Sequence, residues 1–341
     1  MPRARTVVLP WAVPLLAVGA IALGLTACSG SDPDQPTGSL TVACVGSSDL
    51  CRELTAAFQT QTAVVTDFIQ LDPLDPPPAA GQADLWHGAS GPGLAQAQAD
   101  GRLQAYRSPQ AAELPAEVSP PDGWWVGLSA DPIGFCSNRT VLDELGLAWP
   151  QTWDELLAPG WQGQIALGHP AVAATSYQAL WNLEQSRGAD AAFDYLRALN
   201  PAVLQYTVSD EAALTLLQTG QVALTWASAS ACASAAADQP TLVWSAVEDG
   251  AAFDLAGLAL LAEAANPRAA QAYIDWALSA AAQNLALAQG DWRLPTAPAA
   301  ELVPGLPPLR LIKLIPSDPA AAQSAHDALV GRFNAEIALA P

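Results

Sequence analysis

Strand-like and helix-like segments alternate along this chain from residue 40 onward. Residues 40–45 are a short apolar run, residues 50–60 repeat apolar side chains at helical spacing, and residues 64–71 are strand-like again. A strand–helix–strand order joins parallel strands, because the helix carries the chain back across the sheet. The sequence therefore predicts an α/β fold on a mainly parallel sheet.

The alternation continues to the C-terminus in two groups of units, which predicts two lobes. Further strands are predicted at 83–87, 164–167, 203–206, 222–225, 241–246 and 256–261. Helices are predicted at 94–99, 140–145, 176–185, 189–199, 210–218, 267–278, 280–287 and 320–339.

Some connections carry their own signals. Residues 88–93 are glycine-rich and predict a turn, and Thr152 with Glu155 predicts a capping box at a helix start. Residues 124–138 form a long extended stretch that Asp131-Pro132 is expected to break. The extended segments 125–131 and 248–257 are the predicted hinges.

The N-terminus reads as an export signal. Arg3 and Arg5 precede an uncharged run, residues 6–27, which is close to the ~20 residues of a spanning helix and leaves a transmembrane anchor as an alternative. However, Leu25-Thr26-Ala27-Cys28 resembles a bacterial lipobox. The chain is therefore expected to lose residues 1–27 as a signal peptide, to be lipidated at Cys28, and to have a flexible tether at 28–38.

The charge excludes one class of function. Among 341 residues, Lys+Arg number 13 and Asp+Glu 33, which gives −20. A nucleic-acid binder needs a basic face, so no nucleic-acid partner is expected. Residues 1–27 hold two arginines and no acid, so the mature charge becomes 11 − 33 = −22.

Four cysteines remain after Cys28 is assigned to the lipid: Cys44, Cys51, Cys136 and Cys232. An even number outside the cytoplasm predicts two disulfides, and counting alone leaves three pairings open. Four buried free thiols are the alternative. The spacing contains no close CxxC pair, so no metal site is predicted.

The motifs of common enzymes are missing. The sequence contains no GxGxxG, GK[ST], HExxH or GxSxG motif, and His87, His169 and His326 stand in unrelated contexts. We therefore expect neither an enzyme nor a cofactor.

An ordered series of segments resembles the bacterial extracellular solute-binding proteins of ABC importers, in the branch for ferric iron, phosphonate or polyamine-type ligands. The matching segments span most of residues 40–335 and are 83–88, 101–109, 132–138, 150–157, 205–207, 253–257, 270–278, 293–296 and 311–315. The resemblance implies a two-lobed type II periplasmic-binding-protein (Venus flytrap) fold that closes on a ligand by hinge motion. Residues 39–131 and 254–300 would form lobe 1, and residues 132–253 and 301–341 lobe 2.

The resemblance also implies a disulfide pairing. Cys136, which follows Gly-Phe, would pair with Cys232, as in that branch of the family. Cys44 and Cys51 flank one turn and would form a local bridge.

Ligand contacts are implied at two turns of lobe 1. Ser47 and Ser48 follow the first strand, and His87, Gly88 and Ser90 follow Trp86. Simple N-capping is the alternative for the serines, and packing at a strand end is the alternative for His87. The predicted set is completed by Asp131, Thr175, Tyr177, Trp226, Ser228, Ser230 and Glu248.

The chain departs from its relatives in one loop of lobe 2. Relatives often read Asn-Pro-Ala-Ser-Ser-Gly-Thr-Ala-Tyr there, an anion-binding loop, and residues 169–177 read HPAVAATSY here. Thr175 and Tyr177 match, but Val172 and Ala173 replace the paired serines. No two tyrosines are adjacent, unlike in ferric binders. We therefore expect a small polar organic solute, and the tryptophan faces with Asp131, Glu248 and Asp249 as counter-charge favour one that bears an amine.

The predicted function is that of a lipid-anchored, extracytoplasmic, monomeric binding protein that delivers its solute to an ABC permease and ATPase. A sensor lipoprotein of the same fold is an alternative. A flytrap-fold enzyme with a reactive cysteine is another.

Overall fold

The computed structural model describes residues 36–73, 75–316 and 318–338. The predicted signal peptide, Cys28 and residues 29–35 of the predicted tether lie outside this range. Within the described residues, no helix combines the length and apolarity that crossing a membrane requires.

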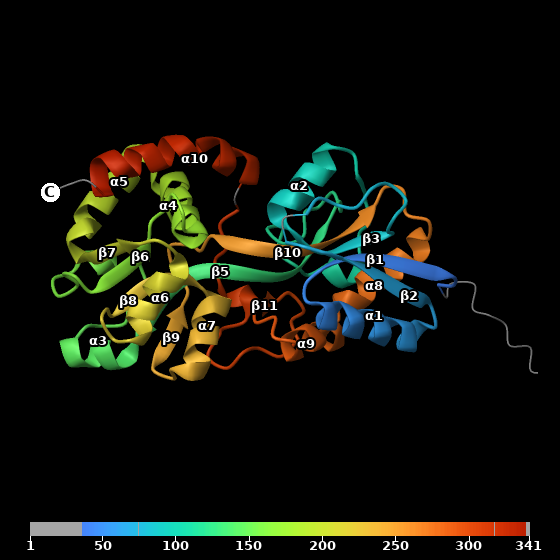
Figure 1. The fold of residues 1–341 in the computed structure, drawn as a ribbon, viewed down its shortest axis with the longest axis horizontal. Helices are drawn as coiled ribbons and strands as arrows, with labels where there is room; N and C mark the ends of the chain where they lie inside the picture. Colours follow the sequence, from blue (N-terminus) through green and yellow to red (C-terminus); the bar gives the residue numbers. More distant parts are fainter. Residues whose placement is uncertain (1–35, 74, 317, 339–341) are drawn as a thin grey trace, which may run out of the picture. The chain divides into compact units, whose positions relative to one another are not determined.

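The first group of strands is the parallel set that the sequence predicts. β1 (Ser39–Val45) lies between β2 (Val65–Leu71) and β3 (Leu85–Ser90). Figure 1 shows α1 (Ser48–Thr62) and α2 (Gly91–Ala99) on opposite sides of these strands. α8 (Pro267–Ala277) and α9 (Ala280–Ala288) pack beside α1 and β1. β10 (Phe253–Leu261) adds an antiparallel strand next to β3.

The second group is built around β6 (Ile165–Gly168), which is parallel to β7 (Val203–Thr207) and β8 (Leu224–Ser228). Its helices are α3 (Arg139–Leu145), α4 (Ala174–Arg187), α5 (Ala189–Leu199), α6 (Asp210–Gln218), α7 (Ala229–Asp238) and α10 (Pro319–Phe333). Short elements occur in both groups of the described residues. They are β4 (Leu103–Gln104), β9 (Leu242–Ser245), β11 (Leu294–Pro295), four 3-10 segments at 109–111, 154–157, 200–202 and 309–311, and a π-helical turn at 334–338.

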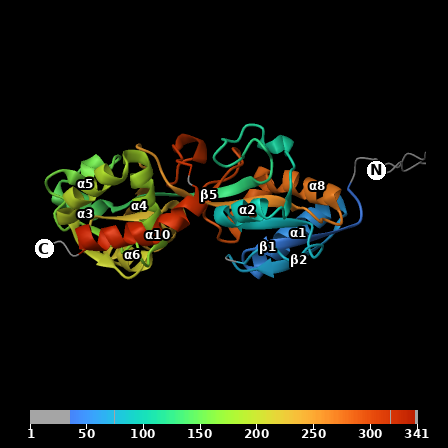
Figure 2. The ribbon, with the colours of Figure 1, turned by 90° about the horizontal axis from the view of Figure 1, so that it is seen from above.

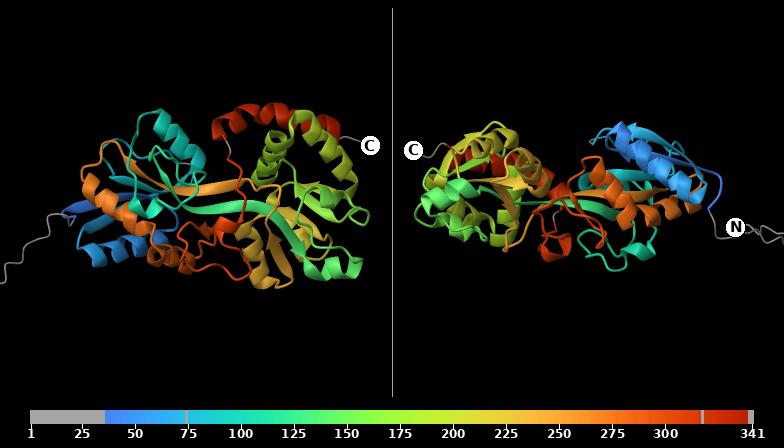
Figure 3. Two further views of the ribbon diagram at one scale, coloured as in Figure 1. Left: turned by 180° about the vertical axis from the view of Figure 1, so that it is seen from behind. Right: turned by 90° about the horizontal axis from the view of Figure 1, so that it is seen from below.

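β5 (Val126–Asn138) belongs to both groups (Figures 1 and 3). Its first half pairs with β10 up to Pro132, and its second half pairs with β8 from Ile133. The predicted break at Asp131-Pro132 is therefore wrong. Proline lacks an N–H, but Pro132 sits where the strand changes partners, and the next amide, that of Ile133, donates to Ala252 O at 2.8 Å.

Two local predictions need correction, and one helix was not predicted. The predicted turn at 88–93 is instead the end of β3 followed directly by α2, because Ser90 Oγ caps the helix at the Gly93 amide. Thr152 caps no helix; the Glu155 carboxylate accepts from the Gln151 and Thr152 amides beside a short 3-10 segment. α7 was not predicted, because its alanine and serine residues carry no apolar periodicity.

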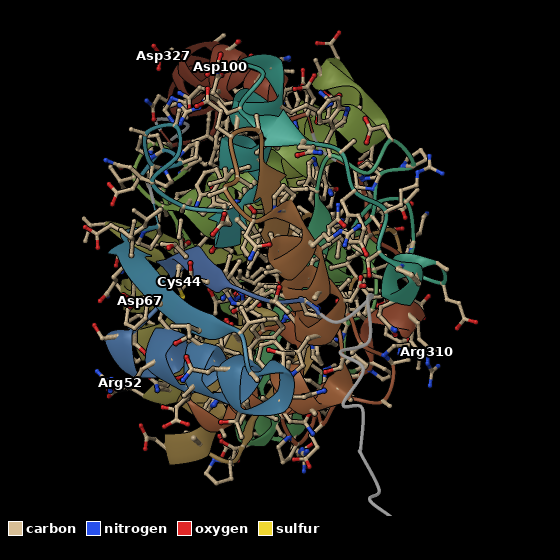
Figure 4. The ribbon with its side chains drawn as sticks, turned by 90° about the vertical axis from the view of Figure 1, so that its right-hand side faces the viewer. Cys44, Arg52, Asp67, Asp100, Arg310 and Asp327 are labelled. Carbon is tan, nitrogen blue, oxygen red and sulfur yellow. A yellow bond between two sulfur atoms is a disulfide. The ribbon has the colours of Figure 1, made fainter. Side chains whose placement is uncertain are left out.

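Two disulfides join elements of the fold, and they are the pairs that the resemblance implies. Cys44 in β1 is bonded to Cys51 in α1, with Cα atoms 6.0 Å apart. Cys136 in β5 is bonded to Cys232 in α7, with Cα atoms 5.7 Å apart. Figure 4 shows Cys44 among the ribbons, whereas labelled charged side chains such as Arg52 and Arg310 lie at the periphery.

Candidate ligand-binding site

Two carboxylates lie opposite each other on the strands that connect the two groups. The antiparallel register of β5 and β10 pairs Asp131 with Asp254. Asp131 is 8% exposed, whereas Asp254 is exposed. Directly opposed residues of neighbouring strands project to the same face, so the two negative charges are held close together.

The N-terminus of α7 holds Asp131 in place. The Ser230 amide donates to Asp131 Oδ1 at 2.9 Å, and Ser230 Oγ donates to Oδ2 at 2.5 Å. Ser228 Oγ caps the same helix at the Ala231 amide, at 3.3 Å. Burial raises the pKa of Asp131. Hydrogen bonding to the carboxylate from Ser230, and from the Ser228 hydroxyl as well, opposes that rise.

Asp254 is held from α4. Gln178 Nε2 donates to Asp254 Oδ1 at 2.6 Å. Solvent reaches part of the Asp254 side chain, but the protein atoms around the carboxylate displace much of its water. This desolvation raises the pKa of Asp254. The Gln178 hydrogen bond opposes the rise, and the like charge of Asp131 adds to it.

One guanidinium lies near both carboxylates. Arg293 forms two hydrogen bonds with Asp291, from Nε at 2.7 Å and from Nη2 at 2.6 Å. Burial disfavours its charge, but Asp291, Asp131 and Asp254 keep the pKa of Arg293 above its usual value. One carboxylate thus pairs with the guanidinium and two more act on it through their charge. The cluster of Asp131, Asp254, Asp291 and Arg293, called here the hinge cluster, therefore has a negative excess.

Two larger cavities flank the hinge cluster, and a smaller one, of about 40 Å³, is lined by Asp291 and Arg293 together with His87 and Gly88. The first, of about 520 Å³, includes Asp254 and Gln178 in its wall and lies among α2, α4, β10 and α10. The second, of about 370 Å³, is lined by Ser230, Asp291, Arg293 and their neighbours. Figures 1 and 2 show α10 running past α4 toward α2, which it contacts. The first cavity therefore lies between elements of both groups, as a ligand cleft requires.

Some of the predicted site residues meet at this place. Ser230 donates to Asp131 as described above, and Ser228 Oγ lies 3.4 Å from Ser230 Oγ. Tyr177 lines the 520 Å³ cavity, where its hydroxyl donates to Ala322 O of α10 and its ring lies 4.7 Å from that of His326.

The predicted residues of the β1–α1 and β3–α2 connections have local structural roles. Ser47 and Ser90 cap α1 and α2, and Ser48 Oγ donates to Gln70 Oε1. His87 is buried, and its Nδ1 lies 3.2 Å from the hydroxyl of Tyr273. Burial, followed by the positive charge of Arg293, lowers its pKa to about 4, so His87 is neutral at pH 7.

Of the remaining predicted residues, Gly88 lines a small cavity together with Asp291 and Arg293, whereas Trp226 and Glu248 do not line the cavities beside the hinge cluster. Gly88 has a left-handed backbone beside Val45, with φ +77°. Trp226 is buried in the core of the second group, 5.0 Å from the ring of Trp153. Glu248 is exposed, and its amide donates to Gln151 O.

The N-terminus of α4 already holds an anionic group of the protein, the carboxylate of Asp210 at the start of α6. The Thr175 amide donates to Asp210 Oδ2 at 3.0 Å, and Ser176 Oγ lies 3.4 Å from Oδ1 of the same carboxylate. The N-cap residue Ala173 offers no side-chain bond. Because a helix N-terminus attracts one negative group, Asp210 fills the place that an anionic ligand would take.

Sequence reasoning missed Asp254, Gln178 and Arg293 as site residues. Asp254 and Arg293 stand in segments that carry the family resemblance, 253–257 and 293–296, which was a signal that could have found them. Gln178 has no such signal, because only the packing of α4 against β10 brings its amide to Asp254.

Comparisons with known proteins agree with this architecture. The family model described as bacterial extracellular solute-binding protein matches residues 83–321. An uncharacterised protein of Haemophilus influenzae is 30% identical over 282 residues, which is 80% of this chain and 81% of that protein. Among solved structures, the periplasmic binding protein AfuA from Actinobacillus pleuropneumoniae, with fructose-6-phosphate bound, is 27% identical, with a TM-score of 0.60 over 89% of this chain and 99% of that one.

A more distant structure has the same fold. The Bordetella ferric binding protein is 17% identical, with a TM-score of 0.71 over 87% of this chain and 99% of that one. The expected fold is thereby confirmed as that of type II periplasmic binding proteins. The chain belongs to the bacterial extracellular solute-binding protein family, whose members serve ABC importers.

Proposed function

We propose that this protein captures a small organic solute bearing an amine and delivers it, as a lipid-anchored binding protein, to an ABC permease and its ATPase. The observation that carries the ligand class is the negative excess of the hinge cluster. A cationic group relieves the repulsion between Asp131 and Asp254, whereas an anionic group would add to it.

The loop before α4 supports the same ligand class. Asp210 occupies the amides at this helix N-terminus, and the paired serines of relatives are replaced by Val172 and Ala173. A phosphate ester bound there would meet a carboxylate instead of a free anion site. The fructose-6-phosphate in the AfuA structure is therefore not carried over to this chain.

The lobes in this proposal are those implied by the sequence, residues 39–131 with 254–300 and residues 132–253 with 301–341. The partner change in β5 at Pro132 supports the first boundary. The C-terminal segment passes from lobe 1 to lobe 2 over several residues. The Glu301 amide still donates to Asn284 of α9 in lobe 1, whereas the Ile315 amide donates to Ala251 O in lobe 2. Bending of β5 and β10 would close the lobes on the solute.

The ligand class is tested with protein that starts at Ser29. Melting temperatures are measured with alkyl and aromatic amines, diamines, hexose phosphates, aminophosphonates and ferric citrate. Each compound is present at about 1 mM, a concentration that reveals weak ligands. We expect an amine to raise the melting temperature and hexose phosphates to leave it unchanged. Stabilisation by hexose phosphates or ferric citrate alone would overturn the proposed ligand class.

The anchor is tested separately in the producing bacterium. We expect the natural chain to sediment with membranes and Cys28→Ser to lose the lipid. Mass spectrometry of the mature N-terminus supplies the readout, and an unmodified Cys28 in the natural chain would contradict the anchor.

A further inference from the structure

The 520 Å³ cavity has an unusual wall for a polar-solute site, because most of its surface is apolar. Its size lies in the range of small-molecule sites, roughly 300–1,000 Å³. The apolar part comes from α2, β10, the 116–125 segment and α10, and its aromatic members are Trp125, Tyr177, Trp181, Phe253 and His326. Two acids, Asp254 and Glu117, also line it.

Asp254 lines this cavity, and one of its two carboxylate oxygens already accepts a hydrogen bond from the protein. Oδ1 accepts from Gln178 Nε2, and among the described residues no hydrogen bond to Oδ2 is recorded. The carboxylate is thus oriented by protein while an acceptor remains for a ligand. An ammonium group placed there would gain a charge-assisted hydrogen bond and would face aromatic rings on the same wall.

The α10 side of the cavity is fixed by contacts with α4. The Tyr177 hydroxyl donates to Ala322 O, and the Tyr177 ring packs on His326. Because Gln178 follows Tyr177 on the same helix, one turn of α4 both holds the aromatic wall and orients Asp254. The aromatic wall and the carboxylate are therefore both positioned by α4.

We propose that this cavity is a subsite for a primary ammonium group carried on an apolar or aromatic body, with Asp254 as the residue that selects for the charge. This inference rests on the proposed function and narrows the ligand to an amphiphilic monoamine. A short hydrophilic diamine bound at Asp254 would have only Glu117 as a second acid in this wall, and wherever its second ammonium group does not reach Glu117 that charge lies against apolar surface, which costs binding free energy.

Gln178 acts as a positioning residue. Its amide donates to Asp254 and thereby favours the charged carboxylate, while its own Oε1 is buried without a partner among the described residues. Gln178→Met removes the donor but keeps the length of the side chain. Loss of the donor raises the pKa of Asp254 further, so binding of an amine should be lost at a higher pH than in the natural protein.

The test compares 2-phenylethylamine with 2-phenylethanol, which keeps the aromatic body and lacks the charge. Binding is followed by calorimetry and by tryptophan fluorescence, since Trp125 lines the cavity. We expect the amine to bind at least about tenfold more tightly than the alcohol, which corresponds to about 1.4 kcal/mol. Putrescine is expected to bind more weakly than 2-phenylethylamine.

Three variants complete the design. Asp254→Asn should abolish the preference for the amine, and Gln178→Met should shift the pH profile of amine binding upward. Asp143→Asn, at an exposed position of α3, should change neither. A preference for the amine that survives in Asp254→Asn would overturn the subsite.

The outcomes also separate the two proposals. If putrescine binds more tightly than 2-phenylethylamine in the natural protein, the apolar subsite is wrong and the amine-binding function stands. If no amine binds and hexose phosphates do, the proposed function itself fails.

Discussion

At the residue scale, Gly88 shows how closely the carboxyl ends of β1 and β3 approach each other. Its φ of +77° is a left-handed conformation, and an added Cβ would lie 2.6 Å from Val45 O. The resemblance placed Gly88 among the ligand contacts, but this geometry gives it a structural requirement of its own.

Gly88→Ala is expected to destabilise the fold by more than the roughly 1–2 kcal/mol of left-handed strain alone, because the methyl group also meets a backbone carbonyl. Gly101→Ala is the matched control, since its φ is +67° and nothing lies within 4 Å of an added Cβ. Urea unfolding measures both free energies. Equal losses would show that the contact with Val45 has no cost.

Asp254→Asn is expected to raise the melting temperature at pH 7 by a few degrees at most. Asp254 has a pKa above its ordinary 3.8 in the fold, so the folded state binds the proton more tightly than the unfolded state. Stability from this group is therefore present at low pH and is lost as the pH rises through the folded pKa.

The gain from Asp254→Asn should consequently shrink as the pH falls toward about 4. Calorimetric scans at several pH values measure it. A variant that melts lower at pH 7 would contradict the repulsion between Asp131 and Asp254, and a higher melting temperature also excludes misfolding as the cause of lost amine binding.

At the element scale, the two disulfides join elements at very different separations. Cys44–Cys51 closes a separation of 7 residues between β1 and α1, and Cys136–Cys232 closes 96 residues between β5 and α7. Closing a longer loop removes more freedom from the unfolded chain.

Replacing Cys136 and Cys232 together by serine is expected to cost about 4–5 kcal/mol, against about 2 kcal/mol for the Cys44 and Cys51 pair. The difference should appear in urea midpoints of the two double variants, both purified under the same oxidising conditions. An equal cost would show that residual structure or native packing, rather than loop length, sets the contribution of each bridge.

Most elements were predictable because each carries its own periodicity. α1, α5 and α8 bury one apolar stripe, and β1 contains the short apolar run that the sequence predicts as a strand. α7 was missed because alanine and serine differ too little in hydropathy to mark one face in the sequence, although Ala229, Cys232 and Ala233 form its buried face; the disulfide to Cys136 ties this helix to β5 only in the assembled fold.

At the scale of the whole molecule, the net charge of −20 becomes −22 if the leader is removed as predicted. Such a field draws a cation toward the protein and is screened by salt over roughly 10 Å at 0.1 M. It has no comparable effect on a neutral solute.

We therefore expect the affinity for 2-phenylethylamine to fall several-fold between about 20 mM and about 500 mM NaCl. The weak binding of 2-phenylethanol should stay constant or increase over the same range. Calorimetric titration at four salt concentrations measures the slope. A slope of zero for the amine would show that the field of the protein's net negative charge does not contribute to binding.

The sequence by itself determined the α/β alternation, the candidate export signal and the absence of common enzyme motifs, because these depend on local periodicity and on residues adjacent in the chain. The family resemblance added the fold and the cysteine pairs. Only the tertiary structure placed Asp131 opposite Asp254, brought Gln178 and Ser230 to them, and put Asp210 at the start of α4. Strand register and helix packing join residues that are far apart in sequence, so no local pattern could reveal this arrangement.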